Sequence, residues 1–285
     1  MKMNPSILKV GTLLRPSTPT LKESFLQIKE VFETQGIEVM LESISAGMIG
    51  FRGMDFELMC QEVDALLSLG GDGTLISALR RSYGYKIPAF GINTGHLGFL
   101  TAIGPSEAKE FGCMLTSGNY AIDEHMMLEG IIQTDKGEKR FYVLNEVLIS
   151  KKNISGMLKI YAKIAKEIFN VYYVDSLIVG TPTGSTAYNI SAGGAVVYPF
   201  CRNILLTPIS AHSLTQRPMV LSDEFMLEFS VEDDCVLVVD GQEILQMQKN
   251  DILFISPASL SAKLIQKKSR SYFRILKEKF KWGEE

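Results

Sequence analysis

The sequence predicts an α/β N-terminal domain with a parallel sheet, followed by a mainly β C-terminal domain. Three observations predict this fold class. As far as residue 103, apolar strand-like runs alternate with helix-like segments, which is the order found in a parallel sheet covered by helices. Beyond that point, apolar and polar residues alternate one by one, as they do in half-buried strands. A chain of 285 residues is long for one domain and comfortable for two, so we expect domains at residues 1–103 and 104–285.

The predicted elements of the first domain alternate in type. Ile7–Leu14 is an apolar run that predicts a strand. From Leu21 to Phe32 the apolar residues recur at helical spacing, and Gly36 is suited to end that helix. Three more strands are expected at residues 37–41, 65–69 and 87–92, with helices at residues 74–83 and 105–115.

The second domain is expected to consist mainly of strands. Leu158–Ile164 alternates apolar and polar residues, and Phe225–Val231 and Cys235–Val239 look alike. Asp240-Gly241 follows the last of these runs and is a strong signal for a hairpin turn. The final segment, Tyr272–Phe280, looks more helical than the strands before it.

The composition favours a globular protein of the cytoplasm. Hydrophobic residues make up 46% of the chain and charged residues 21%, an ordinary balance for a protein with a sizeable core. The formal net charge is −3, so nucleic acid is not an expected partner. No apolar run approaches the roughly 20 residues that span a bilayer, and the N-terminus lacks the order of a signal peptide. The 4 cysteines and 3 histidines are scattered, without the spacing of zinc ligands.

A glycine-rich turn, Gly70-Gly71-Asp72-Gly73-Thr74, follows a predicted buried strand and precedes a predicted helix. Glycines let such a turn point several N–H groups at one anion. A carboxylate inside it would repel a phosphate, but it has a role beside a bound Mg²⁺, or as the group that accepts a proton from an alcohol attacking phosphorus. The alternative is a turn in which Asp72 only caps the helix. The chain has no G-x-x-x-x-G-K-[ST] and no G-x-G-x-x-G motif, so neither a P-loop nor a dehydrogenase site is expected.

Two further segments combine polar side chains with apolar strands. Asp175–Gly194 runs from a strand into a stretch dense in hydroxyls and glycines. This stretch suits sugar hydroxyls and an adenine ring, and a long polar loop is the alternative. Asn145-Glu146 interrupts a strand predicted from Phe141 to Ile149. Neighbouring residues of a strand point to opposite faces, so either one of the pair faces the interior and needs a partner there, or the strand is an exposed edge.

Four motifs occur in the order and spacing of one enzyme family. They are G-G-D-G-T at Gly70–Thr74, G-I-N-T-G-H-L-G-F-L-T at Gly91–Thr101, Asn145-Glu146, and T-P-T-G-S-T-A-Y at Thr181–Tyr188. Together they resemble the NAD kinase family over about residues 70–242. G-G-D-G alone is shared with diacylglycerol and sphingosine kinases and, more distantly, with phosphofructokinases, whereas T-P-T-G-S-T-A-Y is highly specific to the NAD kinases.

The resemblance implies roles for individual residues. Asp72 corresponds to the family's proton acceptor, with Gly73 beside the ligand. Asn145 corresponds to a residue that contacts the adenine, Glu146 to one that binds ribose hydroxyls, and Asp175 to one near the nicotinamide. The other implied pocket residues are Thr186, Ala187, Tyr188, Ser191 and Gln242.

The same resemblance implies a reaction and an assembly. A phosphoryl group passes from ATP, or from polyphosphate, to the adenosine ribose 2′-hydroxyl of NAD, with a divalent cation such as Mg²⁺. Family members are homodimers or homotetramers in which neighbouring subunits complete the site. The tail of the chain, from about residue 272, is expected to pack back on the first domain.

Some features depart from the family, and other functions stay open at this point. Ala195 stands where the family usually has proline, Ser176 stands where it often has glycine, and the role of Ser77 is unassigned.

A lipid kinase would also use G-G-D-G, but it has no need of a hydroxyl-rich segment. A non-catalytic dinucleotide sensor would keep the pocket without turnover, and the intact Asp72 speaks against it.

Overall fold

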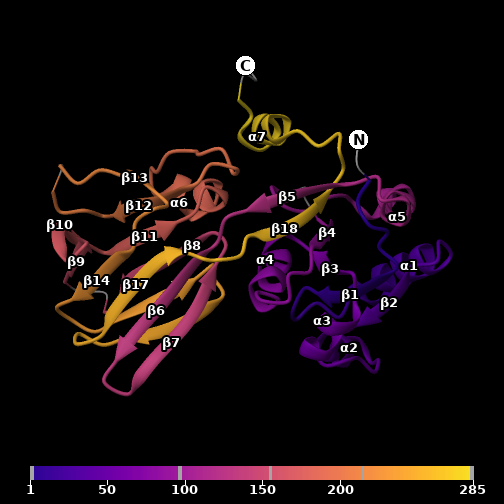
Figure 1. Cartoon of the computed structure of the whole chain (residues 1–285), viewed down its shortest axis with the longest axis horizontal. Coiled ribbons are helices and arrows are strands. Elements are labelled where there is room, and N and C mark those ends of the chain that lie inside the picture. The colour runs from indigo at the N-terminus through magenta and orange to yellow at the C-terminus, as the bar shows by residue number, and fades with distance from the viewer. Residues whose placement is uncertain (1–2, 96–97, 154–155, 214, 283–285) are drawn as a thin grey trace. The chain divides into compact units, whose positions relative to one another are not determined.

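The chain divides into two compact units in the computed structural model (Figure 1). The first unit comprises residues 1–124 and 263–285, and the second comprises residues 125–262. The first unit extends past residue 103 because a helix and a strand after that position belong with its sheet. The structure describes residues 3–95, 98–153, 156–213 and 215–282.

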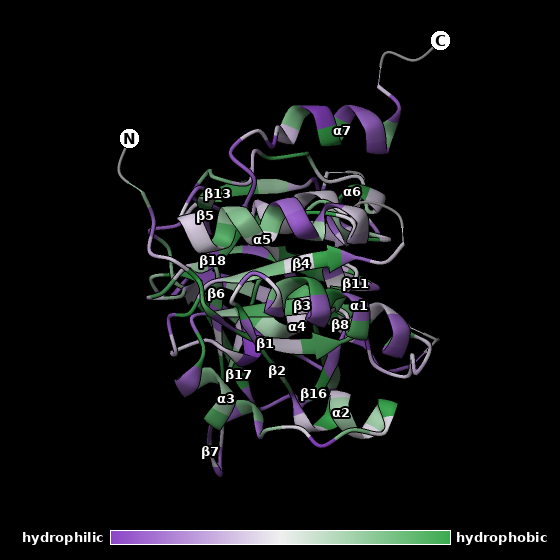
Figure 2. Ribbon diagram, turned by 90° about the vertical axis from the view of Figure 1, so that its right-hand side faces the viewer, coloured by the Kyte–Doolittle hydropathy of each residue, from purple (hydrophilic) through white to green (hydrophobic). Residues whose placement is uncertain are grey.

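The first unit is built on a six-stranded, mostly parallel sheet. Its order is β2-β1-β3-β4-β18-β5, and β4 pairs in parallel with β18 from the far end of the chain. Each of the first four strands lies where an apolar run predicts one, and Figure 2 shows β3 and β4 largely in the green of apolar residues. The strands are β1 (Lys9–Leu14), β2 (Glu38–Leu41), β3 (Ala65–Gly70), β4 (Ala89–Asn93), β5 (Ala121–His125) and β18 (Ala262–Gln266).

The first long helix, α1 (Leu21–Glu33), confirms the helical spacing seen in the sequence. Its buried residues are the four apolar ones at that spacing, Leu21, Phe25, Ile28 and Phe32. The helix ends earlier than Gly36, with Thr34 as its C-cap. Gly36 has a φ of 80°, a left-handed conformation that glycine adopts without strain, so it turns the chain toward β2.

Three further helices of the first unit lie in regions where the sequence predicts helices. Helix α4 (Asp72–Arg81) packs against β3 and β4 with an apolar face that includes Leu75 and Leu79. Helix α5 (Ala108–Ser117) follows a short 3-10 turn at Pro105–Glu107 and packs against α1. Helix α7 (Tyr272–Phe280) has the bounds that the helical pattern predicts.

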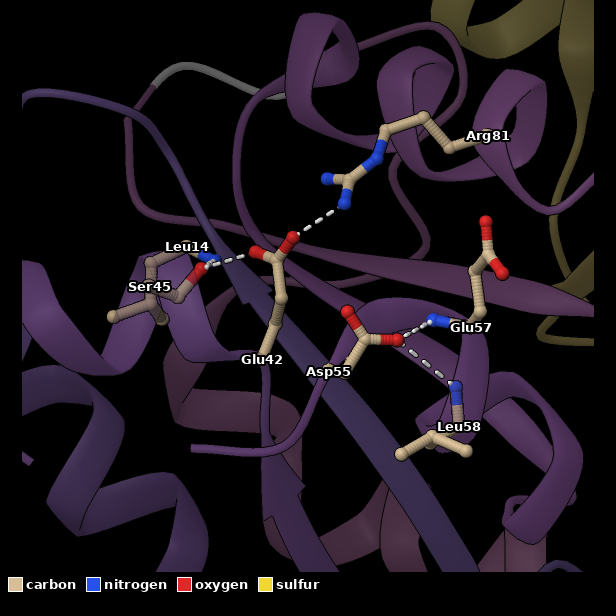
Figure 3. Close-up of polar contacts among 7 residues, drawn as sticks. All are labelled: Leu14, Glu42, Ser45, Asp55, Glu57, Leu58 and Arg81. Atoms are coloured by element: carbon tan, nitrogen blue, oxygen red, sulfur yellow. Dashed lines mark hydrogen bonds and ion pairs between the residues drawn. The ribbon is translucent and has the colours of Figure 1, made fainter. Parts of the chain in front are cut away.

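Two short helices between β2 and β3, α2 (Ser43–Ile49) and α3 (Phe56–Glu62), were not predicted from the sequence. Helix α3 begins after Asp55, whose side chain accepts hydrogen bonds from the backbone N–H of Glu57 at 2.9 Å and of Leu58 at 3.3 Å (Figure 3). A cap of this kind stabilises a helix by about 1 kcal/mol. A helix of this length shows too little periodicity to be found from its pattern alone.

Glu42, just before α2, is a buried carboxylate that connects several elements (Figure 3). Its Oε1 lies 2.5 Å from the guanidinium of Arg81 at the end of α4, and its Oε2 accepts from the Ser45 hydroxyl at 2.9 Å. The Ser45 oxygen accepts in turn from the backbone N–H of Leu14 at 3.0 Å. The guanidinium of Arg81 also lies 3.9 Å from the centre of the Phe56 ring. The C-terminal end of α4 is thereby fixed to β1, α2 and α3.

The second unit contains two antiparallel six-stranded sheets, ordered β10-β9-β14-β17-β6-β7 and β13-β12-β11-β8-β15-β16. Apolar side chains of both sheets form one hydrophobic cluster, as in a β-sandwich. The strands are β6 (Leu128–Thr134), β7 (Gly137–Val143), β8 (Glu146–Lys151), β9 (Leu158–Ile164), β10 (Glu167–Val174), β11 (Ser176–Gly180), β12 (Asn203–Ile209), β13 (Met219–Ser222), β14 (Leu227–Val231), β15 (Cys235–Val239), β16 (Glu243–Met247) and β17 (Ile252–Pro257).

One hairpin prediction is confirmed in this unit and one strand prediction is wrong. Asp240 and Gly241 have φ values of 48° and 66° between β15 and β16, and a type I′ hairpin turn requires positive φ at both positions. The single strand predicted from Phe141 to Ile149 is two strands. Strand β7 ends at Val143 and β8 begins at Glu146 in the other sheet, because the chain crosses between the sheets there.

Candidate active site

Asp72, in the glycine-rich turn, is the first residue of α4, and its carboxylate bonds away from that helix. The N-cap residue is Gly71, and no side chain caps the helix. Asp72 accepts hydrogen bonds from three successive backbone N–H groups, at 2.7 Å from Phe99, 3.2 Å from Leu100 and 3.0 Å from Thr101. The alternative in which Asp72 only caps α4 is therefore excluded.

The close approach of this backbone to Asp72 requires a glycine at position 98. A Cβ atom on Gly98 would lie 2.0 Å from Asp72 Oδ1 and 2.4 Å from its Cγ. The hydroxyl oxygen of Thr101 accepts from the Gly98 N–H at 3.3 Å and so holds the same segment. The sequence shows Gly98 within a motif but gives it no role, because the clash is with a residue distant in the chain. His96 and Leu97 of that motif lie outside the described residues.

One acceptor position of Asp72 stays free within the described part of the chain. A carboxylate offers about four such positions. Oδ1 uses two of them, for Leu100 and Thr101, and Oδ2 uses one, for Phe99. The adjacent Gly73 is exposed, and the start of α4 presents backbone N–H groups and the positive end of the helix dipole. A basic oxygen therefore lies beside a place suited to a phosphate.

In the second unit, Asn145 and Glu146 lie where the chain passes from β7 to β8. The Asp240 carboxylate accepts hydrogen bonds from three successive backbone N–H groups here, those of Leu144 at 3.0 Å, Asn145 at 2.7 Å and Glu146 at 3.0 Å. Asp72 binds residues 99–101 in the same way. The side chains are left for other partners. Asn145 Oδ1 and Glu146 Oε2 are buried, and among the described residues neither has a hydrogen-bond partner. Such oxygens cost free energy and mark a place where a ligand would bind.

Glu146 also has an unusual protonation state. Burial raises its pKa from the ordinary 4.5 to about 8, and the negative charge of Asp240 adds to the rise. At neutral pH the carboxyl group is therefore mostly protonated, and it can both donate and accept a hydrogen bond. A buried carboxyl group perturbed in this way is a candidate for a functional site.

The hydroxyl-rich segment after β11 divides into an inner and an outer set. It forms a 3-10 turn at Thr183–Thr186 and the one-turn helix α6 at Tyr188–Ser191. The inner hydroxyls bond to the protein: Thr181 donates to the Leu144 carbonyl at 2.5 Å, and Ser185 donates to the Val197 carbonyl at 3.0 Å. The outer set comprises the four pocket residues that the resemblance implies in this segment. All four are half-buried or exposed: Thr186, Ala187, Tyr188 and Ser191.

Asp175 lies away from Asn145 and Glu146, whereas Gln242 lies next to the turn that binds their backbone. Strand β11 pairs with β8 so that Gly180 is opposite Glu146, and Asp175 lies at the other end of β11. There it forms an ion pair with Lys151 at 2.5 Å, and the hydrogen bond from Lys151 holds the pKa of Asp175 below its usual range. Gln242 is exposed and follows the turn whose aspartate holds the Glu146 backbone.

Two observations on the described residues complete the description of the site. Among the described residues, no group of three or more His, Cys, Asp or Glu side chains could hold a metal ion. None of the helices in that part of the chain is long and apolar enough to cross a membrane.

The fold is that of solved kinases of nicotinamide dinucleotides. The chain is similar to a yeast NADH kinase in complex with NADH, with a TM-score of 0.87 and 22% identity over 99% of this chain and 89% of that one. It is also similar to an NAD kinase from Archaeoglobus fulgidus in complex with ATP, with a TM-score of 0.76 and 24% identity over 96% of this chain and 98% of that one. Identities this low show a shared fold alone.

Sequence similarity identifies the family of the chain. The family models for the ATP-NAD kinase N-terminal and C-terminal domains match residues 51–120 and 144–267. An NAD kinase of Wolinella succinogenes is 53% identical over 98% of this chain and 97% of the relative. An NAD kinase of Helicobacter hepaticus is 53% identical over 99% of this chain and 98% of the relative. The chain belongs to the NAD kinase family, which confirms the resemblance of its four motifs.

Proposed function

We propose that this chain is an enzyme that transfers the terminal phosphoryl group of ATP to the adenosine ribose 2′-hydroxyl of NAD, giving NADP and ADP. The observation that carries the proposal is the 53% identity to NAD kinases over almost the whole chain. Both family domains are matched, which speaks against a lipid kinase that shares only the G-G-D-G turn.

In this reaction Asp72 acts as the general base. A ribose hydroxyl is a very weak acid, so its proton must leave as the oxygen bonds to phosphorus and the bond from phosphorus to ADP breaks. Three backbone N–H groups orient the Asp72 carboxylate and leave one acceptor position on Oδ2, which would take this proton. The start of α4, with Gly73, would hold the transferring phosphoryl group by charge and position, which supply most of the catalysis in such reactions.

The adenosine part of NAD is proposed to bind at Asn145 and Glu146. Their buried oxygens lack partners among the described residues, and the adenine amino group and the ribose hydroxyls would supply the missing hydrogen bonds. Tyr188 is 47% exposed and offers a ring for stacking. The remaining proposed contacts are Thr186, Ala187, Ser191 and Gln242, with Asp175 near the nicotinamide.

The divalent cation is proposed to enter with ATP, as Mg²⁺ bound to the phosphates. Mg²⁺ is usually held by substrate phosphates, one or two carboxylates and water. The carboxylate nearest to the proposed phosphate position is that of Asp72, at the start of α4. Polyphosphate is the alternative donor. We further propose a homodimer or homotetramer and a cytoplasmic location.

Replacement of Asp72 by asparagine tests this function. The purified protein is assayed for NADP formation with NAD, Mg²⁺ and ATP, and in parallel with polyphosphate. General-base assistance contributes about 10²–10⁴-fold, so Asp72→Asn should bind NAD and lose kcat by that factor. Asp55→Asn is the matched control, because Asp55 caps α3 and asparagine caps a helix equally well.

The possible outcomes separate the competing functions. NAD binding without NADP formation by the wild type would indicate a dinucleotide sensor, and phosphorylation of diacylglycerol would indicate a lipid kinase. If Asp72→Asn retains more than roughly a tenth of the wild-type kcat, the loss is smaller than general-base catalysis supplies. That result would show that Asp72 is not the general base. Recovery of Asp72→Asn at high Mg²⁺ would assign the carboxylate to the cation instead.

A further inference from the structure

The backbone segment that binds Asp72 is held from its other side by Arg270. Arg270 lies between β18 and α7, in the same unit as Asp72. Its guanidinium donates hydrogen bonds to the carbonyl oxygens of Leu100 at 3.2 Å and Thr101 at 3.0 Å, and to that of Phe99. The segment is neither helix nor strand, so these side chains take the place of a regular backbone partner.

Two peptide groups of this segment connect the carboxylate to the guanidinium. The peptide between Phe99 and Leu100 donates its N–H to Asp72 and accepts from Arg270 at its carbonyl. The peptide between Leu100 and Thr101 does the same. Each peptide dipole points its positive end at the carboxylate and its negative end at the guanidinium, so the bonds strengthen one another. Removal of the guanidinium would therefore loosen the hold on Asp72.

Burying the charged guanidinium of Arg270 costs free energy, so packing alone does not explain this residue. Burial lowers the pKa of Arg270, and the negative charges of Asp72 and Asp123 oppose this effect. Burial also raises the pKa of Asp123, on β5, and the charge of Arg270 counteracts that rise. Within the described residues, the guanidinium forms no ion pair and donates only to the three carbonyls. Its planar fork of five N–H donors matches such a set, whereas the single ammonium of a lysine does not.

We propose that Arg270 is a positioning residue for phosphoryl transfer. It fixes the Phe99–Thr101 backbone so that the N–H groups of that segment present Asp72 in one orientation, with one acceptor position directed to the substrate. The proposal rests on the proposed function, in which Asp72 is the general base. Arg270 lies outside both segments that match the family models, which end at residues 120 and 267.

Steady-state kinetics of two variants test the role of Arg270. Arg270→Met keeps the apolar stem and removes every donor, and Arg270→Lys keeps the charge without the fork. A misplaced catalytic group costs up to about 100-fold, so Arg270→Met should lower kcat by about 10- to 100-fold and Arg270→Lys by less. The KM for NAD and for ATP should stay within about threefold, because binding of the substrates is not removed. Arg274→Met, an exposed change on α7, is the control and should keep the wild-type kcat.

A double variant separates action through Asp72 from a general structural role. With Asp72→Asn in place, Arg270→Met should change the residual kcat by less than about twofold, because the group that Arg270 positions is already gone. Loss by the same factor in both backgrounds overturns the proposal, as does wild-type kcat in Arg270→Met. If circular dichroism shows that Arg270→Met is unfolded, the same comparison is made with Arg270→Lys, and the same two results overturn it. An active Asp72→Asn enzyme contradicts the general base instead, so the two failures are distinguishable.

Discussion

Replacing Glu146 by glutamine should stabilise the second unit at neutral pH. Glu146 is 8% exposed, and its Oε2 lacks a partner among the described residues. Its pKa is raised to about 8 by burial and by Asp240. Glutamine has nearly the same shape and carries no charge at any pH, so Glu146→Gln removes the cost of keeping an acidic group in this place.

The sign of the effect follows from proton binding. Between pH 4.5 and about 8, the unfolded chain has released the Glu146 proton while the folded chain retains it. The free energy of unfolding therefore falls as the pH rises through this window. Each pH unit corresponds to about 1.4 kcal/mol, so from about pH 5 to pH 7.5 the wild type should lose about 3 kcal/mol through this group. Glu146→Gln should not lose it.

Urea unfolding of the two proteins at pH 5 and pH 7.5, followed by circular dichroism, measures this difference. Glu138→Gln, which replaces an exposed glutamate of β7, is the control and should follow the wild type at both values. We also expect Glu146→Gln to raise the KM for NAD, because a carboxyl group in contact with ribose hydroxyls would be lost. A stability difference between Glu146→Gln and wild type that is equal at the two pH values would refute the reasoning.

Three further predictions concern other parts of the chain. Gly98→Ala should lower kcat at least about tenfold in a folded protein, because the new Cβ displaces the proposed base. Gly95→Ala should keep the wild-type kcat, because its Cβ would lie 3.7 Å from its nearest neighbour. Equal kcat values for the two variants would contradict the geometry. Glu42→Ala should lower the free energy of unfolding by about 1.5–3 kcal/mol, because it removes the charge-assisted hydrogen bonds of a buried carboxylate to Ser45 and to the partly exposed Arg81. Glu38→Ala, in an exposed pair, should cost less than about 1 kcal/mol, which thermal unfolding can check. Tyr188→Ala should raise the KM for NAD about tenfold with stability unchanged, and an unchanged KM would exclude stacking.

The sequence predicted those features whose signal is local. Leu158–Ile164 alternates cleanly because one face of β9 is buried and the other is not. Asp240-Gly241 is a turn because few residue pairs tolerate positive φ at both positions. Tyr272–Phe280 has a helical period over its whole length. In each case the residues that determine the structure are neighbours in the chain.

The features that escaped prediction depend on residues far apart in the chain. The contacts of Asp72 with residues 99–101 arise only when β3 and β4 lie side by side. Apolar residues flank the exchange of sheets on both sides, at Phe141–Leu144 and Val147–Ile149, so the apolar pattern continues through the break. Composition alone could not separate the inner hydroxyls of residues 181–185 from the outer ones. The roles of the individual site residues in binding and catalysis stay predictions.

Strand β18 has a consequence for how the protein is made. It lies between β4 and β5 in the sheet of the first unit, yet it consists of residues 262–266, so a ribosome must complete the second unit before this sheet can close. Domains that are continuous in sequence fold as they emerge, whereas the first unit must wait with a gap beside β4. A chain cut short at residue 262 would keep the second unit whole. Strands β4 and β5 would then expose unpaired edges of the kind that pair with strands of other chains. Premature termination near the end of this gene should therefore yield aggregated protein rather than a shortened enzyme.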